Sequence, residues 1–154
     1  MNLADKNKVV YLINTADYNS GVDGDSINMK GIHRATIIFL FGAITGDAIL
    51  YIYSGATNAA KTSALTFKYK YGGAACGSTL SDVYSTESTS AALTLTGTTY
   101  ANRCLICEID ASAMDLANNE EWLTVSLSDA ASAGILHTVA ILEPRYSDGA
   151  TSIV

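Results

Sequence analysis

The strongest constraint on the fold is a succession of short β-prone runs that recur about every ten residues along the chain. Clusters of Gly, Ser, Asn and Asp separate these runs, as turns require. No stretch of ten or more residues keeps the apolar period of 3.6 that an amphipathic helix needs. We therefore predict an all-β domain of about eight to ten antiparallel strands, folded as a β-sandwich, with the jelly roll as one candidate topology.

Three runs define the expected core. Residues 35–41 (ATIIFLF) are apolar at odd and even positions alike, which suits a central sandwich strand better than a solvated one. A turn-forming GAITGD segment follows, and residues 48–53 (AILYIY) are predicted to pair with the first run as a hairpin. Residues 65–71 (LTFKYKY) alternate strictly, so their aromatic side chains are predicted to face the core and their lysines the solvent.

Less regular structure is predicted in two further segments. Residues 82–99 are rich in Ser and Thr, and weak strands are expected there at 83–86 and 92–96. Residues 111–119 (ASAMDLANN) fit either one helical turn or a loop. Neither segment interrupts the succession of strands.

The chain shows no internal repeat, and we divide it into three parts. Residues 1–25 are polar and turn-rich around one β-prone run, and are predicted to form an N-terminal arm or first strand. Residues 26–146 carry the sandwich, and residues 147–154 form an exposed tail. Pro144 is expected to end the last core strand, because it has no N–H to donate to a neighbouring strand.

Charge and hydropathy exclude several classes of protein. The net charge is −6, and no cluster of Lys and Arg offers the basic stripe that nucleic-acid binding needs. No apolar run approaches the roughly 20 residues of a membrane helix, and no secretory signal is apparent. Charged residues make up 16% of the chain, against roughly 25% on average. This low charge suits either a compact domain with Ser/Thr-rich faces or a surface covered by neighbouring subunits.

The motif that suggests metal or redox chemistry most directly is Cys104-x-x-Cys107. It lies within a predicted strand, where positions three apart face opposite sides of the sheet, so the two thiols are not expected to share a metal ion. The odd total of three cysteines also favours reduced thiols. We predict no cofactor and no metal site.

The remaining polar residues predict no catalytic centre. His33 and His137 are the chain's two histidines, and no G-x-S-x-G elbow accompanies them, so we interpret both as packing or interface residues. Asp23-x-Asp25 lacks the twelve-residue loop of an EF-hand calcium site. Trp122 and the tyrosines at 51, 53, 69 and 71 fit either the core, a subunit interface or a platform for a sugar ring.

Two segments carry a resemblance to a known family. Residues 30–53 (KGIHRATIIFLFGAITGDAILYIY) and residues 139–146 (VAILEPRY) resemble segments that recur in this order in head decoration, or cement, proteins of tailed bacteriophages. Residues 120–128 are similar to the strand that precedes the closing segment in these proteins. The resemblance covers most of the chain, roughly residues 30–146.

The resemblance implies a β-sandwich, without catalytic residues, that attaches to the outside of an assembled capsid and stabilises the expanded head. It implies the major capsid protein as partner, a homo-oligomer with a trimer favoured, and a final place on the virion surface. Synthesis in the host cytoplasm is expected because no secretory signal is apparent. Arg145 is a plausible partner for an acidic group across an interface, because its guanidinium pairs with carboxylates. Contacts at the same interface are predicted for Tyr18, Trp122 and Tyr146.

Other functions remain open from the sequence. The chain fits a tail, baseplate or fibre protein, or a glycan-binding module displayed on the particle. A hydrolase would require a polar constellation, and the sequence shows no motif for one.

Overall fold

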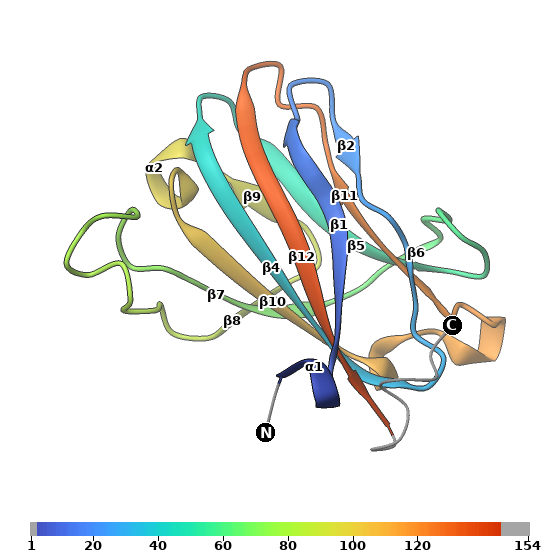
Figure 1. Ribbon diagram of the computed structural model, residues 1–154. Helices are drawn as coiled ribbons and strands as arrows, with labels where there is room; N and C mark the ends of the chain where they lie inside the picture. The colour runs from blue at the N-terminus through green and yellow to red at the C-terminus, as the bar shows by residue number, and fades with distance from the viewer. Residues whose placement is uncertain (1–2, 146–154) are drawn as a thin grey trace.

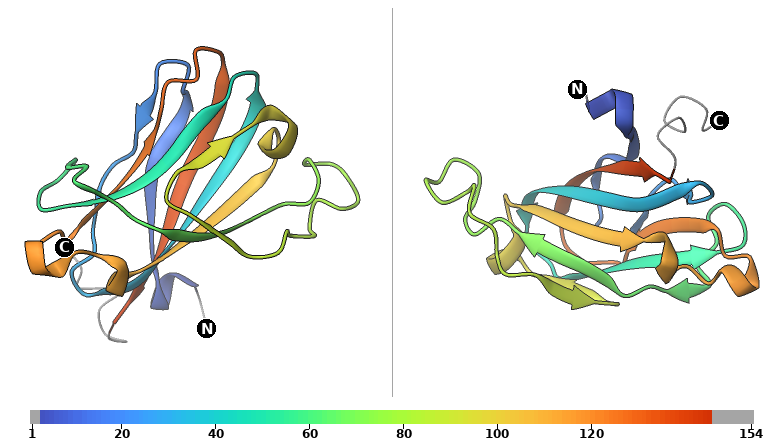
Figure 2. Two further views of the ribbon diagram at one scale, coloured as in Figure 1. Left: turned by 180° about the vertical axis from the view of Figure 1, so that it is seen from behind. Right: turned by 90° about the horizontal axis from the view of Figure 1, so that it is seen from below.

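The protein is a β-sandwich of two antiparallel sheets (Figure 1). This computed structural model describes residues 3–145. Sheet A has six strands, in the order β1 (Lys8–Asp17), β12 (Gly134–Pro144), β4 (Ile32–Ile44), β10 (Cys104–Asp110), β7 (Phe67–Tyr71) and β8 (Ser88–Ser90). Its long strands stack on those of the second sheet, as the view from below in Figure 2 shows. The predicted all-β sandwich is confirmed.

Sheet B is built around two long strands. Its order is β2 (Val22–Asp23), β11 (Trp122–Leu127), β5 (Ala48–Gly55) and β6 (Ser63–Ala64), with β3 (Ile27–Asn28) pairing to β11 and β9 (Leu93–Leu95) pairing to β5. The helical segments are short, namely α1 (Leu3–Lys6), α2 (Gly97–Tyr100), η1 (Ala111–Ala113) and η2 (Leu116–Asn118). Among the described residues, no helix has the length and apolar character needed to cross a membrane.

The predicted hairpin between residues 35–41 and 48–53 is wrong. β4 lies in sheet A, between β10 and β12, whereas β5 lies in sheet B and pairs with β11. Both edges of β4 are thus occupied by other strands, and the turn after Ile44 carries the chain across to the opposite sheet. The Gly-rich segment correctly marked a reversal, but turn chemistry does not specify which sheet the next strand joins.

The core lies between the two sheets and is filled from alternate strand positions. On β10 partly exposed and buried positions alternate, with Leu105, Cys107 and Ile109 facing inward. On β7, Phe67 is buried while Lys68 and Lys70 are exposed, as the alternation predicted. The largest fully buried apolar side chains include Phe39 and Phe67, with Leu50, Ile52 and Leu123 opposite them from sheet B.

The N-terminal region is more ordered than an arm. β1 pairs along its length with β12, with register shifts after Tyr11 and after Ile13, and Leu12 and Ile13 are buried in the core. The segment that follows supplies β2 to sheet B, and Asp25 donates its N–H to the Leu12 carbonyl oxygen at 3.0 Å. From Lys8 onward this region is part of the sandwich. The predicted tail at 147–154 lies outside the described residues.

The weaker predictions had mixed outcomes. The strand expected at 92–96 is present as β9, but 83–86 forms only an isolated bridge, between Tyr84 and Gly72. A further strand, β8, occurs nearby. Residues 111–119 form two short 3₁₀ turns, η1 and η2, so the helical reading of this segment was the closer one. The loop between β7 and β8 extends to one side of the sandwich (Figure 1).

Candidate interaction surface

The outer face of sheet A carries a continuous set of large apolar side chains. Strand register places Tyr11, Val139, Ile38 and Ile106 in one row across β1, β12, β4 and β10. The rows on either side extend the set. We call these side chains the sheet A patch: Val9, Tyr11, Ile38, Leu40, Ile106, Ile135, Val139 and Ile141.

Several members of the sheet A patch are strongly exposed. The exposed fractions are 55% for Val9, 50% for Tyr11, 48% for Leu40 and 45% for Ile135. Single exposed apolar residues are common on proteins, but a contiguous apolar surface marks a contact with another molecule. The sheet A patch is therefore a candidate interaction surface.

An aromatic pair stiffens this surface. The Tyr11 hydroxyl lies 3.1 Å from His137 Nδ1, and the two rings meet edge to face with centroids 4.7 Å apart. These residues come from neighbouring strands, so the pair links β1 to β12 on the open side of the sheet. His137 thus has the strand-packing role predicted for it. Such rigid aromatic side chains lose little conformational entropy when a partner binds.

Charged side chains border the patch on two sides. At one end Glu143, Arg34 and Asp110 lie in a single cross-strand row. Along β7 the border consists of Lys68 and Lys70, with Glu108 beside them on β10 and Glu87 on the loop before β8. Lys68 Nζ and Glu87 Oε1 form an ion pair at 3.2 Å.

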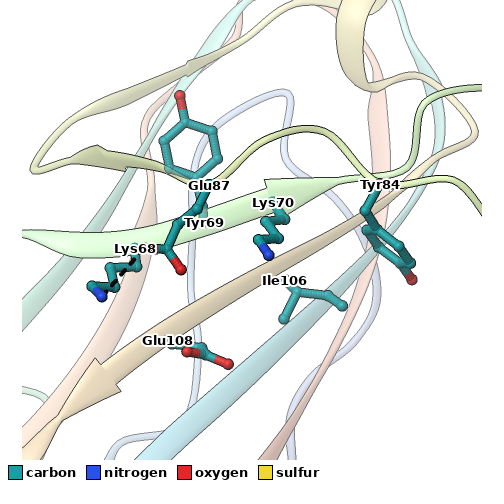
Figure 3. A pocket seen from close by; sticks show the side chains of 7 residues that line it. All are labelled: Lys68, Tyr69, Lys70, Tyr84, Glu87, Ile106 and Glu108. Carbon is teal, nitrogen blue, oxygen red and sulfur yellow. Dashed lines mark ion pairs between the residues drawn. The ribbon is translucent and has the colours of Figure 1, made fainter.

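A pocket of about 250 Å³ lies within this border. Lys70, Ile106 and Glu108 line its floor, and Tyr84 contributes from the loop (Figure 3). Tyr69 contributes to the lining, but its ring points away from the lysines. The pocket holds both charge signs and one apolar side chain, which suits a protein segment of mixed character.

The part of the outer face of sheet B around Thr124 and Ser126 on β11 is covered by the chain itself. Residues 56–62, between β5 and β6, reach across to the strand segments on the far side of β11. Ala59 donates its N–H to Ser26 Oγ at 2.9 Å, and Ser26 Oγ lies 2.7 Å from Thr124 Oγ1 on β11. A Cβ atom at Gly55 would approach the Ala60 Cβ to 2.5 Å, so this close crossing requires glycine there. We call residues 56–62 the covering loop.

An ion pair fastens the covering loop. Lys61 Nζ lies 2.8 Å and 3.0 Å from the two carboxylate oxygens of Asp23, and Ser126 donates its hydroxyl to Asp23 at 2.6 Å. Burial acts to raise the pKa of Asp23, but these hydrogen bonds from Lys61 and Ser126 outweigh it and leave the pKa below its ordinary value. Asp23 therefore works as an ionised anchor for the loop, and the Asp23-x-Asp25 pair has this structural explanation.

The four predicted interface residues do not form one site. Arg145 is exposed, donates its N–H to the Gly31 carbonyl oxygen at 2.9 Å, and lines a small pocket with Glu121. Trp122 is partly buried at the start of β11 in sheet B. Tyr18 is fully buried, which corrects its assignment to a surface, and Tyr146 lies outside the described residues.

Tyr18 is a core residue because of the glycine opposite it. Its ring lies against Gly134, where a Cβ atom would collide with the ring, and its N–H donates to the Gly134 carbonyl oxygen at 2.9 Å. Burial, together with the nearby carboxylates of Asp17 and Asp47, raises the pKa of Tyr18 to about 12. The tyrosine therefore stays neutral, and its side chain is not available to a partner.

The predicted aromatic platform is divided between the two sheets. Tyr51 and Tyr53 stack on the outer side of β5, with centroids 5.5 Å apart and an interplanar angle of 24°. Tyr69 and Tyr71 belong to β7 in sheet A and pack against the core, where Tyr71 meets Tyr100 at 5.2 Å between centroids. The five aromatic residues therefore do not share one surface.

The two thiols of the C-x-x-C segment face opposite sides of β10, as predicted. Cys104 is partly exposed on the outer face, whereas Cys107 is fully buried, and burial raises the pKa of Cys107 well above its ordinary range. Within residues 3–145, no three His, Cys, Asp or Glu side chains converge as metal ligands.

Sequence comparisons find no matching protein-family model and no match among the curated proteins. Comparison of structures finds the crystal structure of the SPBc2 prophage-derived protein YomS, with a TM-score of 0.50 and 10% sequence identity. The similar region covers 88% of this chain and 92% of that one. At this identity the likeness concerns the fold, so the chain shares its sandwich architecture with a prophage-derived protein.

Proposed function

We propose that this chain is a structural protein of a phage particle, and more specifically a decoration protein that binds the outside of the head. Three observations support the proposal: the resemblance of residues 30–53 and 139–146 to decoration proteins, the fold shared with a prophage-derived protein, and the sheet A patch. The patch carries the argument for binding to protein, either a capsid subunit or a further copy of the chain, because an apolar sheet face is a surface for binding protein.

The proposed activity is binding without catalysis. The partners would be the major capsid protein and further copies of the chain, with a trimer as the number that the resemblance implies. A protein that binds only the expanded shell stabilises that state by mass action. Several linked copies would then hold the shell with higher avidity than one copy.

The test is a binding experiment on shells. Purified chain is mixed with expanded phage shells, unexpanded shells and free major capsid protein, and binding is measured by co-sedimentation. The proposal expects saturable binding to the expanded shells alone. Equal binding to all three, or none to any, would contradict it. Electron microscopy of the native particle distinguishes a place on the head from one in the tail, baseplate or fibre.

One observation favours a second candidate function. The stacked pair of Tyr51 and Tyr53 lies on the outer side of sheet B, near the polar residues Ser126 and Asp23. Aromatic faces beside hydrogen-bonding groups are suited to sugar rings. A glycan array tests this role: binding that is lost in a Tyr53→Ala variant and kept in Tyr69→Ala would support it.

A further inference from the structure

We infer that the sheet A patch binds a second copy of this chain, sheet face against sheet face. The inference concerns the self-association within the proposed function, on which it rests for the presence of many copies. A patch that packs against the same patch pairs two copies, in place of the trimer that the resemblance implies. The inference assigns a specific surface to self-association. It leaves the shell to be bound by other parts of the molecule.

The size of the face suits this role. Five strands of sheet A, from β1 to β7, contribute to it, and the longest of them, β4, spans Ile32–Ile44. Strand spacing and rise give a face of about 24 Å by 30 Å, or about 700 Å². A standard protein interface buries about 800 Å² on each partner. The whole face is therefore about as large as a stable interface requires.

The charges of the border also favour an identical partner. The border contains three cations, Arg34, Lys68 and Lys70, and four anions, Glu87, Glu108, Asp110 and Glu143. A partner of one predominant sign would leave several of these groups facing like charges, which is costly at an interface. A second copy brings both signs in nearly equal number. In residues 3–145 the ion pair Lys68–Glu87 is the one formed within this border, and Asp110 accepts hydrogen bonds from Ser112, so four charges are available to the partner.

The centre of the face has the composition of a homotypic contact. Interfaces between identical subunits are more apolar at their core than other surfaces, and aromatic side chains are enriched there. The sheet A patch supplies aliphatic side chains around the Tyr11–His137 pair. Two such faces can pack about 10 Å apart, as the two sheets do within one sandwich.

The test is the oligomeric state of the full chain without any shell. Sedimentation velocity is measured on the wild type, on Leu40→Glu and Val139→Lys, and on Leu80→Glu as a matched control. Leu80 is 60% exposed, but it lies in the loop between β7 and β8 and outside the patch. Circular dichroism and thermal unfolding confirm that each variant is folded.

We expect the wild type and Leu80→Glu to associate with the same dissociation constant. Each patch variant should raise that constant by at least about tenfold, because it places a charge in an apolar contact. A wild type that remains monomeric from micromolar to millimolar concentration overturns the inference. So does an oligomer that Leu40→Glu and Val139→Lys leave unchanged while both stay folded.

The outcomes also separate this inference from the proposed function. Suppose that the wild type is monomeric and binds shells, and that Leu40→Glu does not bind them. The patch then binds the shell, and the self-association proposal is wrong. A wild type that associates through the patch but binds no shell keeps the inference and removes the decoration function.

Discussion

The outer faces of the two sheets differ in the polarity and the exposure of their side chains. On sheet B the outward side chains Thr124 and Ser126 are polar, and they form hydrogen bonds with Ser26 and Asp23. The covering loop in turn donates hydrogen bonds to Ser26 and Asp23. Thr124 and Ser126 are buried even though they point away from the core. On sheet A the outward side chains include the eight apolar members of the sheet A patch, and Leu40 among them remains half exposed.

The difference shows where the chain can accept a partner. Along β11, sheet B closes its outer face with its own backbone and side chains, so a partner would first have to displace the covering loop there, whereas Tyr51 and Tyr53 on β5 stay partly exposed. Sheet A offers an apolar surface whose burial would add favourable free energy. Four experiments can break or sharpen this comparison, and we give them in order of decreasing effect.

The largest difference in stability is expected between substitutions on the two sides of β4. Phe39 is fully buried and Leu40 is half exposed, and they are consecutive. Phe39→Ala should lower the free energy of unfolding by about 3–5 kcal/mol, since it leaves a cavity. Leu40→Ala should change it by less than about 0.5 kcal/mol. Urea denaturation of dilute protein measures both, and equal losses would mean that Leu40 is covered within one chain.

The second largest loss of stability is expected from removing a buried carboxylate that forms hydrogen bonds to β5 and β6 at the end of sheet B. Glu120 accepts hydrogen bonds from Ser54 at 2.5 Å and from Ser63 at 3.2 Å. Glu120→Ala would leave the buried Ser54 hydroxyl without this partner and should cost about 1–3 kcal/mol of unfolding free energy. Glu121→Ala is the control, as its carboxylate makes no such bond to β5 or β6. Equal stability of the two variants would contradict this role.

The anchor of the covering loop should give a smaller, pH-dependent effect. Asp23→Ala removes the contacts to Lys61 and Ser126 and should cost about 1 kcal/mol, since the ion pair is partly exposed. The folded state lowers the pKa of Asp23 below 3.8, so its contribution is full above that pH and is lost as the pH falls through the folded pKa.

The measurement is the unfolding free energy of the wild type, Asp23→Ala and Asp25→Ala across acidic pH. Asp25 is the control because it is also exposed and carries the same charge. A difference between the wild type and Asp23→Ala that stays constant down to the lowest pH would show that the carboxylate does not fasten the loop as an anion.

The smallest perturbation is chemical labelling of the thiols. Cys76 is exposed, Cys104 lies on the outer face with a pKa raised by burial, and Cys107 is in the core. Iodoacetamide should therefore label Cys76 first, Cys104 slowly and Cys107 only on unfolding. Mass spectrometry over time gives the order. Labelling of Cys107 at the rate of Cys104 would contradict the placement of β10 between an open face and the core.

Local patterns in the sequence predicted the strands well. The alternation of residues 65–71 gave the two faces of β7, and the position of the C-x-x-C segment gave opposite faces to its thiols. These succeed because side-chain direction in a strand depends only on neighbouring residues. The pairing of strands was harder to predict from local patterns in the sequence. The hairpin between β4 and β5 was wrong because partner choice depends on strands far away in the chain, such as β12.

The candidate surface was missed for a related reason. An apolar run on both faces suits a strand covered on both sides, and residues 35–41 were interpreted in that way. A two-layer sandwich covers only one side of each sheet, so Ile38 and Leu40 are left outward. The sequence did carry a sign of this surface, because residues 35–41 have more apolar side chains than a strand in a two-layer sandwich can bury. The prediction for Tyr18 was wrong in the opposite way, because a residue expected at a surface is buried. The residues near Tyr18 in the sequence do not show that its ring lies against Gly134.

The pairing of β1 with β12 has a mechanical consequence. Lys8, at the beginning of β1, lies opposite Leu142, near the end of β12, so both ends of the sandwich leave from the same corner (Figure 1). A force that pulls these ends apart would open the two strands like a zipper, breaking their hydrogen bonds a few at a time. Strands loaded from opposite ends would instead share the force among all their bonds. The sandwich should therefore resist tension between its own two ends poorly.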